Sequence, residues 1–87
     1  MRYTHEDIPP HMMESLNAYL TIGRPTGGFL NAVLCNDLVK AFGKADDDNF
    51  EIMSAYAEWL YNKCPGNAWG SQEIVDAWLT KKREQRL

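Results

Sequence analysis

The sequence FLNAVLCNDLVKAF, residues 29–42, decides the fold of this chain. When these residues are placed on a helix at about 100° each, their apolar side chains cover most of its circumference. A helix of this kind is normally the central one of a domain, covered by neighbours on several sides. We therefore predict one nearly fully buried helix over residues 29–42, with Leu34 and Leu38 among its most buried side chains.

Amphipathic patterns on both sides of this stretch predict further helices. Before it, Pro9 and Pro10 suit the first turn of a helix, which we expect to end near Ile22 because Gly23 and Pro25 follow. Such a helix would cover one side of the central one.

Two helices are predicted after the central stretch. Asp48 and Glu51 have capping-box spacing, so a third helix should start there and run to about Asn62, before Pro65. Ser71 is a good N-cap for a fourth helix. Trp59 and Trp78 occupy core-facing positions of these two patterns.

The 87 residues, of which 45% are hydrophobic, are enough for one core and too few for two. We predict a single all-α domain over residues 1–87, a compact bundle of about four helices around the central helix. Residues 1–8 form a polar lead, and residues 81–87 form a polar helix end or tail. The basic residues of that tail suit the negative end of a helix dipole better than a nucleic-acid patch.

Charge and hydropathy disfavour some classes of partner. A formal net charge of −3 offers no basic field for phosphates, so nucleic-acid binding is disfavoured. No apolar run approaches the ~20 residues of a membrane span, so no membrane partner is expected. The first ten residues lack the apolar core of a signal peptide, which makes the cytoplasm the expected location.

The residues that usually carry catalysis or bind metals show no paired spacing. Cys35 and Cys64 lie on separate predicted helices, and His5 and His11 lie near the start. This spacing fits no zinc site, and the two cysteines are expected to be reduced, packed thiols. We assign no catalytic residue, no metal and no cofactor.

Asp37 is the polar residue whose predicted position conflicts with its surroundings. The helical wheel places it inside the apolar arc, where an unpaired charge would cost several kcal/mol. If Asp37 has a structural role, its carboxylate should accept hydrogen bonds from backbone N–H groups of a helix start or a loop, or pair with Arg24. A catalytic or ligand-binding carboxylate is the alternative. Asn31 is the second polar residue predicted to be buried for structural reasons.

The glycine-rich turn before the central stretch is a candidate anion site. Backbone N–H groups at a helix start can hold a phosphate, and the candidate residues of the turn are Arg24, Thr26, Gly27 and Gly28. The turn matches no nucleotide-binding motif, and it would equally serve as a tight connection between two helices.

Two aromatic residues outside the predicted helices are candidates for contact with a partner. Trp69 could fold back as a plug beneath the fourth helix or stand exposed as an anchor. Tyr3 belongs to the polar lead, which could be loose or could dock across the bundle.

A set of short motifs resembles a family of small, uncharacterised proteins encoded by bacteriophages and prophages. The resemblance extends over roughly residues 8–79 and rests on GGFL (27–30), AVL (32–34), NDL (36–38), AD (45–46), WLYN (59–62), Pro65 and WGS (69–71). It implies a phage or prophage origin and transfers no functional residue.

Phage genomes hold many accessory proteins of this size that bind host proteins, inhibitors of defence systems among them. By that analogy we expect a non-enzymatic protein that binds a host protein in the host cytoplasm. Self-association is left open. The alternative function is binding of a nucleotide or another phosphate-bearing small molecule at the Gly23–Gly28 turn.

Overall fold

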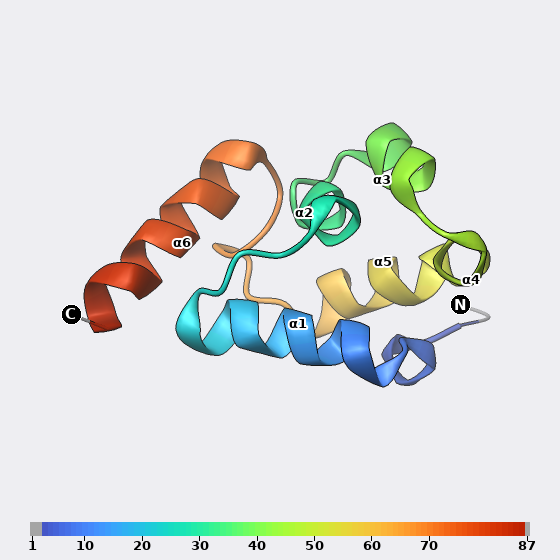
Figure 1. Ribbon diagram of the computed structural model, residues 1–87, viewed down its shortest axis with the longest axis horizontal. Coiled ribbons are helices and arrows are strands. Elements are labelled where there is room, and N and C mark those ends of the chain that lie inside the picture. The colour runs from blue at the N-terminus through green and yellow to red at the C-terminus, as the bar shows by residue number, and fades with distance from the viewer. Residues whose placement is uncertain (1–2, 87) are drawn as a thin grey trace.

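The computed structural model describes residues 3–86. Met1 and Arg2 of the predicted lead and Leu87 of the predicted tail lie outside the described residues. The described chain consists of helices and turns, which confirms the predicted all-α class (Figure 1). In chain order the elements are a 3-10 turn, η1 (His5–Asp7), and the helices α1 (Pro10–Ile22), α2 (Gly28–Leu34), α3 (Leu38–Lys44), α4 (Asp47–Glu51), α5 (Met53–Asn62) and α6 (Gln72–Arg86).

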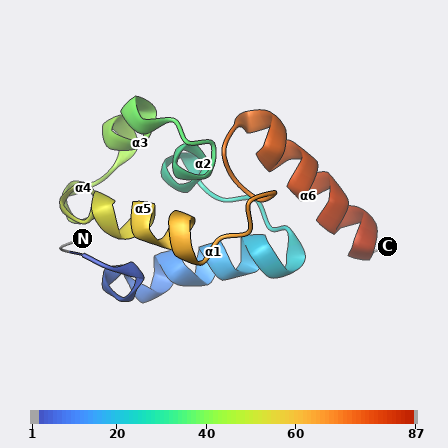
Figure 2. The same cartoon turned by 180° about the vertical axis from the view of Figure 1, so that it is seen from behind.

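The helices form an elongated body of 39 × 23 × 20 Å. In Figures 1 and 2, α1 and α5 lie along its lower side, and α2 lies above them. The short helices α3 and α4 gather at one end, and α6 extends to the other. The central position that the sequence predicts for residues 29–42 therefore belongs to α2 alone.

The first helix begins and ends where its sequence predicts. Pro10 is its first residue, where a missing N–H leaves no hydrogen bond unmade. Gly23 ends it in the left-handed conformation, with φ of 70°. The N–H groups of Gly23 and Arg24 close the last turn on the carbonyls of Tyr19 and Ala18.

The single central helix predicted over residues 29–42 is wrong, because the chain breaks between Leu34 and Leu38. Asn36 has φ of 58°, a left-handed conformation that Asn tolerates better than most residues. Asp37 then caps α3 by accepting the Lys40 N–H at 3.2 Å. The pair Asn36-Asp37 thus ends one helix and starts the next.

The break changes which side chains are buried. Leu34 is fully buried, as predicted, but Leu38 is 65% exposed and Val39 is 82% exposed. The predicted burial of Leu38 is therefore wrong, because α3 leaves the direction of α2 and carries its apolar residues toward the surface.

The third predicted helix is also broken, at Ile52, into α4 and α5. Its cap is Asp46, which accepts the Asn49 N–H at 2.8 Å, and the capping box predicted from Asp48 and Glu51 is wrong. The predicted end at Asn62 is confirmed.

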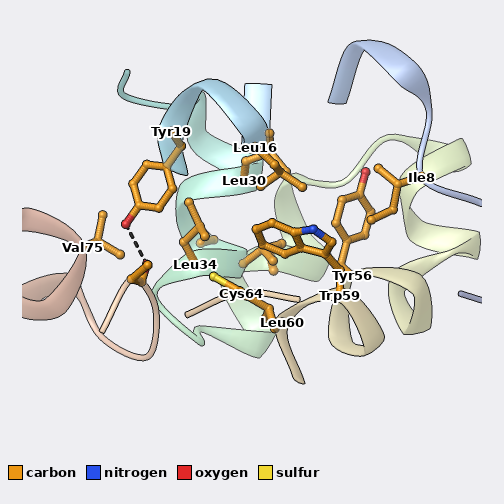
Figure 3. Packing of buried hydrophobic residues seen from close by; sticks show 14 of the residues in the cluster. Ile8, Leu16, Tyr19, Leu30, Leu34, Tyr56, Trp59, Leu60, Cys64 and Val75 are labelled. Carbon is orange, nitrogen blue, oxygen red and sulfur yellow. Dashed lines mark hydrogen bonds between the residues drawn. The ribbon is translucent and has the colours of Figure 1, made fainter. Parts of the chain in front are cut away.

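The core lies between α1, α2, α5 and the start of α6 (Figure 3). Trp59 and Trp78 are buried, as their positions predict. The Tyr19 hydroxyl donates to the Ala68 carbonyl at 2.7 Å, and the Trp78 indole donates to the Tyr19 carbonyl at 3.0 Å. These two hydrogen bonds connect α1, the turn before α6, and α6 itself.

The turn before α6 is held from both sides. The Gly70 N–H donates to the Leu34 carbonyl at 2.8 Å, at the end of α2. Ser71 accepts the Ile74 N–H at 3.2 Å, which confirms it as the cap of α6. The turn therefore gives a buried carbonyl of α2 its partner while it starts the last helix.

Candidate functional site

An apolar groove of about 330 Å³ opens between α3 and α5. The break at Asn36-Asp37 creates it, because α3 turns away from α2 and faces α5 across open space. Figure 2 shows the two helices that form its walls, with α3 above α5. The lining residues are Ala32, Val33, Asn36, Asp37, Leu38, Ala41, Phe42, Met53, Ser54, Tyr56, Ala57 and Leu60.

The two walls of the groove follow helical spacing. On α5, Met53, Ala57 and Leu60 recur at i, i+4 and i+7, so they share one face of that helix. On α3, Leu38 and Phe42 are four residues apart and form the opposite wall. Each wall is therefore an apolar stripe, and no helix within residues 3–86 packs into the space between the two walls.

The floor of the groove is anchored in the core. Ala32 and Val33 of α2 are buried beneath it. Tyr56 of α5 packs edge-on against Phe29, with ring centroids 5.2 Å apart. The groove consequently has a rigid base, although one of its walls belongs to a short surface helix.

Exposed apolar side chains flank the groove. Leu38 at its rim is 65% exposed, and Tyr61, four residues after Ala57 on α5, is 84% exposed. Single exposed apolar residues are ordinary, but a contiguous apolar area beside a groove is typical of a binding surface.

A second hollow of about 440 Å³ lies on the other side of α3 and is more polar. Gln72 at its edge accepts hydrogen bonds from the Asn31 amide and the Cys35 thiol, both at 3.2 Å. Its own amide donates to Asp76 at 2.9 Å. These contacts connect α2 to α6, and they give the half-buried Asn31 its partner.

The environment of both thiols disfavours thiolate chemistry. Burial, with a smaller contribution from Asp76, raises the pKa of Cys35 above its ordinary value. Burial raises the pKa of Cys64 to about 12. Both cysteines are free, and both keep their protons at neutral pH.

The prediction that Asp37 is buried is wrong, because its side chain is exposed. Its wheel position assumed a continuous helix, whereas Asp37 lies just before the first turn of α3. The sequence suggested a helix start, a loop or Arg24 as the partner of Asp37. The structure shows the first of these, because Asp37 accepts the Lys40 N–H at the start of α3.

The anion-binding candidates lie along the connection from α1 to α2. Arg24 is exposed, Thr26 is half-buried, and Gly27 and Gly28 begin α2. The structure brings the Lys44 side chain close to Gly28, a neighbour that sequence reasoning missed because it comes from the far end of α3. A phosphate ligand here stays a prediction, which thermal shift with nucleotides would test.

Both aromatic partner candidates are half-buried and pack against the core. Trp69 lies in the turn before α6, and Tyr3 lies just ahead of η1. The lead docks on α5 through buried Ile8 and through Glu58, which accepts the His5 backbone N–H at 2.8 Å. A role for Trp69 or Tyr3 in binding a partner stays a prediction.

Glu58 and His5 form an ion-pair contact, with His5 Nδ1 3.1 Å from Glu58 Oε2. Desolvation acts to raise the pKa of Glu58, but the hydrogen bonds from the His5 backbone and ring outweigh it. The net result is a pKa below the ordinary value for Glu.

Residues 3–86 contain no cluster of three His, Cys, Asp or Glu side chains placed to hold a metal ion. No helix in this part of the chain has both the length and the apolar character needed to cross a bilayer.

Compared with known protein families, curated proteins and solved structures, the chain matches none of them.

Proposed function

We propose that this chain is a non-enzymatic accessory protein of phage type that binds a host protein in the host cytoplasm, for instance as an inhibitor of a defence system. The observation that carries the binding role is the open groove between α3 and α5, walled by apolar side chains of both helices. The sequence resemblance to phage-encoded proteins supports the proposed origin.

The cost of leaving the groove open supports a role for it. Burying an apolar side chain contributes about 1.5–3 kcal/mol, so a small domain gains by covering such residues. Here Leu38 and Tyr61 stay largely exposed beside the groove. A partner that covers them would recover that free energy on binding.

The non-enzymatic part of the proposal rests on the titratable groups near the surface hollows. Cys35, at the edge of the polar hollow, has a raised pKa and remains a thiol at neutral pH. Asp37 lies at the edge of both hollows, and it already accepts a backbone N–H. Cys35 therefore lacks the thiolate character of an activated nucleophile.

Partner capture with a matched pair of variants tests this proposal. Ala57→Arg places a long charged side chain into the groove, whereas Ala77→Arg makes the same change at an exposed position of α6. We expect wild type and Ala77→Arg to retain the same protein from bacterial lysate and Ala57→Arg to lose it. Equal retention by all three, or none by wild type, contradicts the proposal.

Light scattering on the same three proteins decides whether the chain associates with itself. A monomer leaves the groove available to another protein. A dimer that Ala57→Arg dissociates would instead show that a second copy covers the groove.

A further inference from the structure

The dimensions of the groove select the shape of its occupant. The wall on α5 runs from Met53 to Leu60, about 10 Å at the rise of an α-helix. An apolar groove between two helices over a buried floor can accept the apolar face of an amphipathic helix. An occupant with apolar residues at i, i+3 or i+4, and i+7 would match this length.

The charged residue of the groove lining and the short helix beside the groove are both acidic. Of the described residues that line it, Asp37 alone is charged, and it marks the end nearest the start of α3. At the other end stands α4, because Phe50 packs edge-on against the groove-lining Phe42, with ring centroids 5.1 Å apart. The exposed carboxylates of α4 and its cap are Asp46, Asp47, Asp48 and Glu51, and the first two lie four and three residues before Phe50, on its side of the helix.

The two lysines of α3 are directed elsewhere. Lys40 lines the polar hollow on the other side of the helix. Lys44 runs alongside Gly28, at the start of α2. Among the described residues, no lysine or arginine lines the groove itself.

The acidic end formed by α4 is held in place. The Tyr56 hydroxyl donates to the side chain of buried Asn49 at 2.6 Å, which joins α4 to the floor of the groove. Burial, with a smaller effect of Asp46, raises the pKa of Tyr56, so the hydroxyl keeps its proton and remains the donor. This hydrogen bond therefore joins the acidic helix α4 directly to a residue of the groove lining.

We propose that the groove binds a basic amphipathic helix of the partner protein, with its apolar stripe between α3 and α5 and Lys or Arg residues toward Asp37 and α4. This inference rests on the proposed function, because it names the chemistry of the partner at the same groove. Apolar burial supplies the affinity, and the charges orient the helix and select against acidic segments.

A peptide display selection against the full chain tests the inference. The library encodes helix-forming peptides about 16 residues long, because shorter isolated helices are marginal in water. Selection on wild type with counter-selection on Ala57→Arg retains peptides that need the groove. We expect these peptides to combine an apolar stripe with a net positive charge, and to bind more weakly in about 1 M salt.

Two double variants then distinguish the effect of carboxylates near the groove on peptide binding from the effect of the protein's net charge. The rim pair, Asp46→Asn with Asp47→Asn, neutralises two exposed carboxylates on the Phe50 side of α4, and Glu73→Gln with Glu84→Gln neutralises two exposed carboxylates of α6. We expect the rim pair to weaken binding of a selected peptide about 3- to 10-fold, and the α6 pair to change it less than about 2-fold. Thermal melting of each variant verifies that the fold is intact.

The remaining outcomes overturn the inference in different ways. Groove-dependent peptides that are neutral or acidic, or that bind equally well in high salt, overturn the basic partner and leave the proposed function standing. A dimer that Ala57→Arg dissociates shows that the occupant is a second copy. If no peptide depends on the groove, both the inference and the proposed binding surface fail.

Discussion

Asn36 and Asp37 occupy the point where the chain leaves the direction of α2 and begins α3. Asn36 accepts a left-handed conformation, and Asp37 caps the helix that follows. The Asp37 side chain satisfies the Lys40 N–H locally, which offsets part of the cost of interrupting the helix. The exposure of Leu38 is the direct consequence.

Leu34 and Leu38, which sequence analysis treats alike, should differ sharply when replaced. Leu34→Ala removes a fully buried side chain and should lower the free energy of unfolding by about 2–5 kcal/mol. Leu38→Ala removes a side chain that is 65% exposed and should cost less than about 1 kcal/mol. Urea unfolding of both variants measures the difference, and equal losses would contradict the broken helix.

Asp37 should act as a helix cap and not as a buried charge. Asp37→Ala removes the acceptor for the Lys40 N–H and should cost about 0.5–2 kcal/mol. Asp37→Asn retains a good cap and should change stability by only a few tenths of a kcal/mol. Denaturant unfolding of the two variants decides this, and a larger loss in Asp37→Asn than in Asp37→Ala would refute the capping role.

The helices themselves are short, and their contacts with other elements hold them. Isolated helices of the length of α2 or α3 are unstable in water, so packing and capping must supply their stability. The close approach of α1 to α6 illustrates this, because the end of α1 at Gly23 meets the backbone and side chain of Lys82.

Two glycine replacements should have opposite effects. Gly23→Ala puts a side chain where φ is 70° and where Lys82 occupies the space, so it should destabilise the fold by more than about 1 kcal/mol. Gly43→Ala lies inside α3 with open space around it, and should stabilise the fold by about 0.4–1 kcal/mol. Melting temperatures of the two variants should therefore move in opposite directions, and a shift of the same sign would count against the packing of α1 on α6.

Across the whole molecule, the amino-terminal segment adds a polar contact to the apolar core. Ile8 is buried, and the His5 backbone N–H donates to Glu58 on α5. The lead thus belongs to the folded domain from at least Tyr3 onward, because it shares both the core and a hydrogen bond with α5.

The contact between Glu58 and His5 should make the free energy of unfolding depend on pH. The pKa of Glu58 is lowered in the folded state, so its contribution is present above the unfolded value of about 4.3. It is lost as the pH falls through the lower folded pKa. Glu58→Gln should therefore be less stable than wild type at pH 7, and the difference should shrink below about pH 4.

Glu14→Gln, at an exposed position of α1, is the control for this pH dependence. Urea unfolding between about pH 3 and pH 7 compares the three proteins. We expect the control to track wild type throughout. A difference between wild type and Glu58→Gln that stays constant with pH would show that the carboxylate charge is not what matters.

Helix ends that depend on adjacent residues could be predicted from the sequence. Pro10, Gly23 and Ser71 impose backbone geometry or supply a hydrogen bond within a few residues, and all three act as their residue types predict. The burial of Trp59 and Trp78 followed from regular spacing inside helices that do not break near them. In each of these cases the residue type or the helical period was enough to predict the result.

The sequence by itself determined the all-α class, the outer helix boundaries and most of the core. Only the tertiary structure decided that the chain breaks at Asn36-Asp37 and again at Ile52. A helical wheel assigns each side chain a direction by adding a fixed angle to that of the residue before it. A single break therefore makes the assigned directions of all later residues wrong. The sequence pattern therefore could not predict the groove, because its two walls face each other only after both breaks have redirected α3 and α5.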